Sequence, residues 1–157
     1  MSFTIRRARR EDARRVAEFA MKLVEQHVAY DRARFARLAT SEGMEGFYGG
    51  QTEAEDAAVL VAEAEGRIIG FAYVGYEERN YAELARKAAW LHDIYVDDPD
   101  RHHGAGRQLV EAAVRAASEF GASKLMLSVA VKNSAGRGFF EKMGFQTTMH
   151  EMMLLVD

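Results

Sequence analysis

The chain contains no cysteine, a single proline and no long hydrophobic run. The missing cysteines exclude disulfide bridges, thiolate nucleophiles and cysteine-ligated zinc sites. The N-terminal residues lack the apolar region of a secretory signal, and no stretch approaches the roughly 18 apolar residues of a membrane-spanning helix. We therefore expect a cytoplasmic protein that does not bind membranes.

The rest of the composition is that of an ordinary globular protein. Of its 157 residues, 48% are apolar and 29% are charged, so we expect one domain over residues 1–157 with a substantial hydrophobic core. The formal net charge of −3 argues against nucleic-acid binding through bulk electrostatics. Arginines crowd residues 6–15, but acidic residues interleave with them as they would on a solvated face.

Hydrophobic spacing predicts strands and helices that alternate along the chain. The central unit is a strand, a glycine-rich turn, a helix and a second strand, which we expect to be parallel to the first with a right-handed crossover. The expected elements are strands at 3–7, 57–64, 67–76, 88–96 and 123–131, a final pair of strands within 145–156, helices at 11–28, 31–48, 108–120 and 133–142, and a polar connection with a short helical patch at 77–87.

Residues 101–107 read Arg-His-His-Gly-Ala-Gly-Arg and lie in the turn of that central unit. Glycines at 104 and 106 leave room for successive backbone N–H groups to face one anion, and the helix N-terminus adds its positive dipole. A dinucleotide fingerprint would need glycine in place of Leu109, and a P-loop would need a Gly-Lys-Ser/Thr sequence that the chain lacks. The pattern R-x-x-G-x-G predicts a phosphate cradle, although two such glycines can also serve a turn alone.

Three blocks in this order resemble the GNAT superfamily of N-acetyltransferases, and the resemblance covers nearly the whole chain. The blocks are Asp93-Ile94-Tyr95-Val96, the run from Arg101 to Gly106, and Asn133-x-x-Gly136-x-x-x-Phe140-x-x-x-Gly144-Phe145. The resemblance implies a single α/β (α+β) domain whose central, mixed, strongly twisted sheet has about seven strands flanked by about four helices. It also implies transfer of an acetyl group from acetyl-CoA to a primary amine.

The resemblance assigns the cofactor to the loop and to the strand before it. In the family, backbone N–H groups of the loop bind the pyrophosphate of acetyl-CoA, and the freed end of the fourth strand binds the pantetheine arm. Asn133 matches a residue that contacts the cofactor, although it can also be a simple helix N-cap. The implied cofactor-binding residues are Ile94, Tyr95, Val96, Arg101, His102, His103, Gly104, Ala105, Gly106, Arg107, Asn133 and Phe140.

Two positions depart from the family's pattern. Phe140 replaces a frequent tyrosine that protonates the departing thiolate, and Ser128 replaces a frequent glutamate base. A phenyl ring donates no proton, so the acid is water, another hydroxyl such as that of Tyr95, or absent. A non-catalytic module that binds or senses acyl-CoA is therefore the alternative to an enzyme.

His92 and Asp93 are the remaining candidates for the base. Adjacent residues of a strand point to opposite faces, so we expect only one of them to face the acceptor. Relatives that acetylate diamines have an acidic pair at the matching positions, which makes Asp93 the candidate base or substrate anchor. His92 replaces the other carboxylate with an imidazole, a type of group that serves as an acid or base in many enzymes. Asp93 can equally be a structural hydrogen-bonding residue, and His92 a packed or exposed imidazole. The histidines complete no set of metal ligands, so we expect no metal.

The acceptor is expected between the first two helices, the connection before the fourth strand and the last strands. Acidic and aromatic residues in those segments would attract a cationic amine, which favours a polyamine-like or aminoglycoside-like molecule over a protein N-terminus or lysine. The apolar end of the chain is expected to fill the core or, where exposed, to favour a homodimer. The acceptor-side residues are Tyr30, Asp31, Glu42, Glu45, Phe47, Tyr48, Glu77, Glu78 and Glu83.

Overall fold

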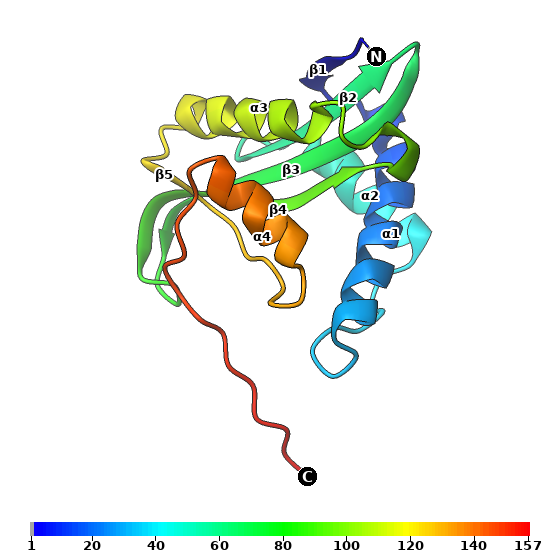
Figure 1. The fold of residues 1–157 in the computed structure, drawn as a ribbon. Coiled ribbons are helices and arrows are strands. Elements are labelled where there is room, and N and C mark those ends of the chain that lie inside the picture. Colours follow the sequence, from blue (N-terminus) through cyan, green and yellow to red (C-terminus); the bar gives the residue numbers. More distant parts are fainter. Residues whose placement is uncertain (1) are drawn as a thin grey trace.

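A computed structural model describes residues 2–157 and is built around one open sheet of five strands in the order β1-β2-β3-β4-β5 (Figure 1). Strands β1 to β4 pair antiparallel, and β4 pairs parallel with β5. The elements are β1 (Thr4–Arg7), the 3-10 helix η1 (Arg10–Asp12), α1 (Ala13–Tyr30), α2 (Ser41–Gln51), β2 (Ala57–Ala64), β3 (Arg67–Asn80), β4 (Ala85–Val96), the 3-10 helix η2 (Asp98–Asp100), α3 (Ala105–Glu119), β5 (Lys124–Met126) and α4 (Ser134–Lys142).

Helices cover both faces of the sheet. Val59 and Val61 of β2 pack in one cluster with Phe19 of α1, whereas Leu60 and its neighbours on the other face pack with Leu109 of α3. This alternation follows from the period of two along a strand, and because both faces are covered, β2 is apolar almost throughout. The sheet is thus the middle layer, with α1 and α2 on one side and α3 and α4 on the other (Figure 1).

The predicted α/β class is confirmed, but the sheet has five strands rather than about seven. Residues 77–87 contain no helical patch, because β3 and β4 continue as a long hairpin that still pairs Asn80 with Ala85. The predicted helix at 31–48 is likewise wrong at its start, since α2 begins only at Ser41, behind the cap formed by Thr40. Residues 145–156 form no strand, because they lie beside no other strand to which their backbone could bond.

The pairing of β4 with β5 positions the site. The parallel ladder joins only three residue pairs, from Ala88 with Lys124 to Trp90 with Met126. Beyond Trp90, β4 continues to Val96 with β3 on one side, and no strand of the described residues 2–157 pairs with its other side. The predicted unit of two parallel strands joined by a helix is confirmed as β4, α3 and β5. The predicted end of its helix at Gly121 is also confirmed, because Gly121 has the positive φ typical of a residue that follows a helix. No helix within residues 2–157 combines the length and apolarity required to span a membrane.

Candidate active site

The glycine-rich run forms the start of α3. Helix α3 begins at Ala105, and Gly104 before it has a φ of 91°, which is a conformation that glycine adopts readily. His102 also has a positive φ, of 68°. The first backbone N–H groups of any helix have no partner within it, and within residues 2–157 no protein group accepts from the N–H groups of residues 102–107. The run therefore presents free donors at the positive end of a helix, which suits a phosphate group.

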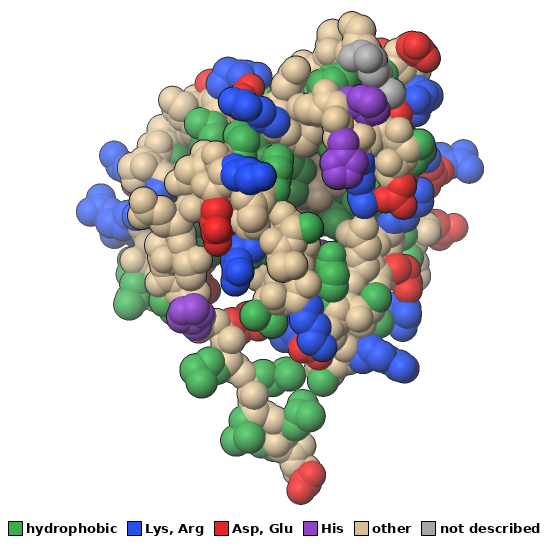
Figure 2. Space-filling model, in the orientation of Figure 1, with side chains coloured by type: hydrophobic (Ala, Val, Ile, Leu, Met, Phe, Trp, Pro, Cys, Tyr) green, Lys and Arg blue, Asp and Glu red, His purple; other side chains and the backbone are tan. Residues whose placement is uncertain are grey.

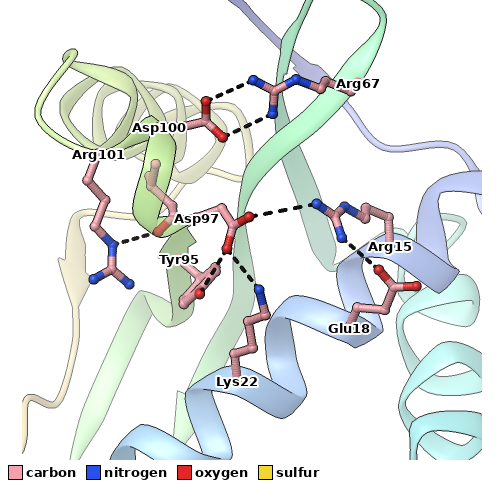
Figure 3. Close-up of polar contacts among 9 residues, drawn as sticks. Arg15, Glu18, Lys22, Arg67, Tyr95, Asp97, Asp100 and Arg101 are labelled. Atoms are coloured by element: carbon pink, nitrogen blue, oxygen red, sulfur yellow. Dashed lines mark hydrogen bonds and ion pairs between the residues drawn. The ribbon is translucent and has the colours of Figure 1, made fainter.

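Side chains around Asp97 and Asp100 hold the segment that leads into this run (Figure 3). Asp100 is buried and accepts two hydrogen bonds of 3.0 Å from the Arg67 guanidinium. Asp97 accepts from Lys22 of α1 at 2.9 Å. Arg101 donates through Nε to the carbonyl oxygen of Val96, at 2.7 Å. Arg101, predicted to bind the cofactor, thus fastens the turn to the end of β4.

The part of β4 that continues beyond β5 lies beside the cradle. Ile94, Tyr95 and Val96 pair with Ala72, Phe71 and Gly70 of β3, and in the described part of the chain no strand pairs with their other side. The approach of β3 is close, because a Cβ atom at Gly70 would lie 2.5 Å from the carbonyl oxygen of Tyr95. The structure therefore brings the two predicted cofactor-binding segments, residues 94–96 and 102–107, to one end of the sheet.

A β-bulge places His92 and Asp93 on the same side of the sheet. Tyr73 pairs with Asp93 and Val74 pairs with Leu91, so His92 is the extra residue. Leu91 and Ile94 consequently both contact the α3 cluster, while His92 and Asp93 both line one pocket on the α1 and α2 side. The expectation that these two side chains point to opposite faces is wrong, because it assumed an uninterrupted strand.

That pocket, of about 240 Å³, lies between α1, α2 and β4. Asp93 is the only carboxylate among its lining residues, and the hydroxyl of Tyr48 donates to Asp93 Oδ2 at 2.6 Å. Burial raises the pKa of Asp93, and the bond from Tyr48 opposes that rise by stabilising the ionised form. The lining residues are Ala20, Leu23, Val24, His27, Phe35, Ala36, Met44, Tyr48, His92 and Asp93.

His92 is the exposed imidazole of the pocket wall. Its ring stacks on Tyr73, with centroids 5.2 Å apart, and lies near Trp90 on the other side. Gly75 makes room for it, since a Cβ there would lie 3.1 Å from His92 Nε2. His92 is therefore held by aromatic packing while its edge stays open to solvent.

The hydroxyl of Tyr95 is already bonded. It donates to Asp97 Oδ1 at 3.2 Å, and the ring packs against Phe19, 5.1 Å between centroids. Burial raises the pKa of Tyr95. The Tyr95 hydroxyl could therefore donate a proton to a leaving group only after its hydrogen bond to Asp97 breaks. In the structure, this bond joins β4 to the turn that follows it.

Helix α4 contributes Asn133 and the two phenylalanines. Asn133 caps the helix, because its side chain accepts from the N–H of Gly136 at 2.9 Å. Phe140 packs with Phe139 and Phe145 against the α3 cluster. The ring of Phe139, which sequence reasoning missed, lies nearest the cradle, 3.6 Å from where a Cβ at Gly106 would be.

Most of the predicted acceptor-side residues lie away from this pocket. Tyr48 alone of them lines it. Glu77 pairs opposite Ala88 far along the hairpin, and Glu78 accepts from the hydroxyl of Tyr76. The pocket is therefore mainly apolar with one carboxylate, rather than rich in carboxylates. His27, Met44 and Phe35, which the sequence analysis did not select as site residues, form much of its wall.

Within residues 2–157, no three His, Cys, Asp or Glu side chains gather as they would around a metal ion. The predicted loop histidines, His102 and His103, are both exposed.

Comparison with known proteins gives a consistent result. The model of the acetyltransferase (GNAT) family matches residues 24–145. The chain is 28% identical over 143 residues to the uncharacterized N-acetyltransferase YhfO of Bacillus subtilis (strain 168), covering 90% of this chain and 89% of that protein. It is also 28% identical over 92 residues to the uncharacterized N-acetyltransferase MJ1207 of Methanocaldococcus jannaschii, covering 59% of this chain and 40% of that protein.

Solved structures share the fold. The tetramutant of the BH1408 protein from Bacillus halodurans has a TM-score of 0.83 at 21% identity, covering 98% of this chain and 99% of that one. The aminoglycoside N-acetyltransferase AAC(6')-Iy, solved in complex with CoA, has a TM-score of 0.81 at 17% identity, covering 99% of this chain and 95% of that one.

Proposed function

Because the chain belongs to the acetyltransferase (GNAT) family, we propose that it transfers the acetyl group of acetyl-CoA to the primary amine of a small cationic molecule. The observation that supports this most is the position of one half-buried carboxylate in a pocket, that of Asp93, on the same strand whose free end leads to the proposed phosphate cradle. Acceptor and cofactor would then meet along β4. Residues 1–157 would act as one domain in the cytoplasm.

The cofactor would be held by backbone groups. Free N–H groups of residues 102–107 would bind the pyrophosphate, with Arg107 adding charge at the helix start. The pantetheine arm would run along Ile94 to Val96, and Asn133 and Phe140 would border it from α4. Because the backbone would make most of the contacts, its conformation at Gly104 matters. The φ of 91° there is one that a residue with a side chain would adopt only with strain.

Asp93 would act on the amine. Burial raises its pKa toward the range where a carboxylate can accept a proton from an ammonium group, while the hydroxyl of Tyr48 keeps it oriented. The neutral amine would attack the thioester carbonyl directly, with both substrates bound and no acetylated enzyme. His92, on the same wall, would relay the proton to solvent. The thiolate would take its proton from water, or from Tyr95 if that hydroxyl leaves Asp97.

A small amine suits the pocket better than a polypeptide. Its volume of about 240 Å³ and its mainly apolar wall fit one alkylammonium arm, whose charge would pair with Asp93. The fold shared with AAC(6')-Iy, which has been solved with the bisubstrate analogue CoA-S-monomethyl-acetylneamine, supports including aminoglycosides among the candidates.

The test is release of free thiol from acetyl-CoA in the presence of diamines, polyamines, aminoglycosides and peptides with free N-termini or lysines. We expect turnover with at least one small polyamine or aminoglycoside, and a loss of about 10²-fold or more in kcat/KM in Asp93→Asn. The exposed Glu55, before β2, provides the control Glu55→Gln, with unchanged kinetics. Calorimetric binding of CoA without turnover on any amine would instead indicate a non-catalytic acyl-CoA-binding module. An acetylated enzyme trapped without acceptor would rule out direct attack.

A further inference from the structure

The pocket that holds Asp93 has a second polar group, which the proposed function does not use. His27, in the last turn of α1, lines the α1 wall, whereas Asp93 lines the wall formed by β4. The two side chains are near enough that a positive charge on His27 would lower the pKa of Asp93. Apart from β4, the only other polar lining residue is Tyr48, and its hydroxyl already bonds to Asp93.

A hydrogen bond fixes the proton on the His27 ring. Nδ1 lies 2.7 Å from the carbonyl oxygen of Leu23, one turn earlier in α1. A carbonyl oxygen only accepts, so Nδ1 must carry a hydrogen, and the neutral ring then has its lone pair on Nε2. Edge-to-face contacts with Tyr30 and Phe35, at centroid distances of 5.7 and 5.0 Å, hold the ring in this position. His27 thus presents a hydrogen-bond acceptor in a fixed orientation.

The nitrogen with the lone pair is accessible to a ligand. Within residues 2–157, Nε2 of His27 has no hydrogen-bond partner, and the one buried side-chain nitrogen or oxygen without a partner in that range is Nε1 of Trp90. Nε2 of His27 is therefore in contact with solvent. Because Nδ1 faces its own helix, Nε2 points away from the backbone of α1. A ligand in the pocket that this ring lines can donate to it.

The charges of the pocket limit what such a ligand can carry. Asp93 alone among the lining residues is acidic, so it balances one ammonium group. A second ammonium in this mainly apolar space would lose hydration without gaining an opposite charge. The face of the molecule shown in Figure 2 carries basic and acidic side chains intermixed, with no large acidic area that would attract a polycation (Figure 2). A neutral donor, such as a hydroxyl, can bond to His27 without this cost.

We propose that the pocket selects amino alcohols, with the amine of the acceptor at Asp93 and a hydroxyl of the same molecule donating to Nε2 of His27. This selection rests on the proposed function, in which Asp93 binds the reacting amine, and it adds a partner for the other end of the molecule. Leu23, Val24 and Met44 line the pocket as well and suit the carbon chain that joins the two groups. His27 is thus a specificity residue rather than a catalytic one.

Paired acceptors test the proposal. Each amino alcohol in a series of increasing chain length is compared with the alkylamine that lacks only the hydroxyl. The comparison uses kcat/KM from thiol release and, without any chemistry, calorimetric affinity for the complex of the protein with CoA. We expect the best amino alcohol to exceed its alkylamine by about tenfold in both quantities. A diamine of the same length should show no such gain, because its second amine is charged.

Two variants of His27 assign this preference to the ring nitrogen. His27→Phe keeps an aromatic ring beside Tyr30 and Phe35 but has no lone pair, so it should remove the preference. His27→Gln has a side-chain oxygen that can accept, and it should restore part of the preference. His150→Phe makes the same change at an exposed histidine outside the pocket and should retain all of it. A natural chain without the preference, or a preference that persists in His27→Phe, would overturn the proposal.

The two measurements also separate this proposal from the proposed function. If no amine is acetylated but affinity still depends on the hydroxyl and on His27, the enzyme proposal fails and the selection of amino alcohols stands. If both members of each pair are acetylated with equal efficiency, the reverse holds. If neither member binds to the complex with CoA, both proposals are wrong.

Discussion

The Tyr48 hydroxyl donates a hydrogen bond of 2.6 Å to Asp93 Oδ2, joining the second half of α2 to strand β4, which leads to the proposed phosphate cradle. Burial raises the pKa of Tyr48, so this hydroxyl keeps its proton and remains a donor. The bond therefore favours the ionised form of Asp93 against the opposing effect of burial.

Tyr48→Phe should move the acidic limb of the pH profile of kcat/KM to higher pH. Without the hydroxyl, burial is opposed only by the weaker effects of His92 and His27, so the pKa of Asp93 rises further and a larger fraction of the carboxyl is protonated at a given pH. A protonated base is inactive, and kcat/KM on the acidic limb should fall by about tenfold. Tyr76→Phe removes a hydroxyl bonded to the exposed Glu78 and should leave the profile unchanged. A limb that stays in place in Tyr48→Phe would mean that Asp93 is not the base.

Asp100→Asn should weaken both the fold and CoA binding. The buried carboxylate accepts both bonds from Arg67, and an amide would turn an N–H group toward that guanidinium. We expect a loss of about 1–3 kcal/mol in unfolding free energy, measured with urea, together with a higher Kd for CoA by calorimetry. Glu53→Gln, which affects an exposed pair with Arg10, is the comparison and should change neither quantity measurably. Unaltered CoA affinity in Asp100→Asn would show that the conformation of residues 101–107 does not depend on the contact between Asp100 and Arg67.

Gly104→Ala should raise the Kd for CoA more than it affects stability. At a φ of 91° the added Cβ costs about 1 kcal/mol, and relief of that strain would turn the first N–H groups of α3 away from the anion. Gly46→Ala is the control, because Gly46 lies inside α2 with no atom near its would-be Cβ. That change should stabilise the protein by about 0.5–1 kcal/mol with normal CoA binding. Equal CoA affinity in both variants would contradict the cradle.

Asp12 should make stability depend on pH in the acidic range. Its carboxylate accepts from Arg6 at 2.8 Å and from the N–H of Arg9 at 2.7 Å, and chiefly the bond from Arg6 holds its pKa below the ordinary value. A group whose folded pKa is lowered stabilises the protein fully above its unfolded pKa of about 4, and that contribution is lost as pH falls through the folded pKa. The unfolding free energies of the natural chain and Asp12→Asn should thus differ near neutrality and converge in acid. A difference that stays constant with pH would refute this role, and Glu11→Gln is the exposed neighbour for comparison.

The parts of the site that depend on local sequence could be predicted, and those that depend on distant contacts could not. The glycine turn before α3 was predictable because Gly104 and the start of α3 are adjacent in the chain, and the cap of α4 was predictable because Asn133 bonds only three residues ahead. The contact of Tyr48 with Asp93 joins positions 45 residues apart, and no spacing within either segment indicates it.

The β-bulge at His92 could have been recognised from the sequence, but the sequence analysis did not predict it. Apolar residues that face α3 occur at Ala89 and Leu91, and then at Ile94 and Val96. The step of three between Leu91 and Ile94 breaks the alternation of an ordinary strand and marks one additional residue. The C-terminal residues show the opposite limit, because residues 149–156 have a strand's composition but form no strand in the structure.

The inserted His92 lets the chain add a reactive side chain without disturbing the interior. If that residue were deleted, Leu91 would still point toward α3, Asp93 would still point toward Tyr48, and regular alternation would simply be restored. The chain could therefore lose the His92 imidazole and still keep the Asp93 carboxylate in its place. A shortened strand could keep Asp93, the proposed anchor for a positive charge, while losing His92, the proposed proton relay, so the two proposed roles could evolve separately.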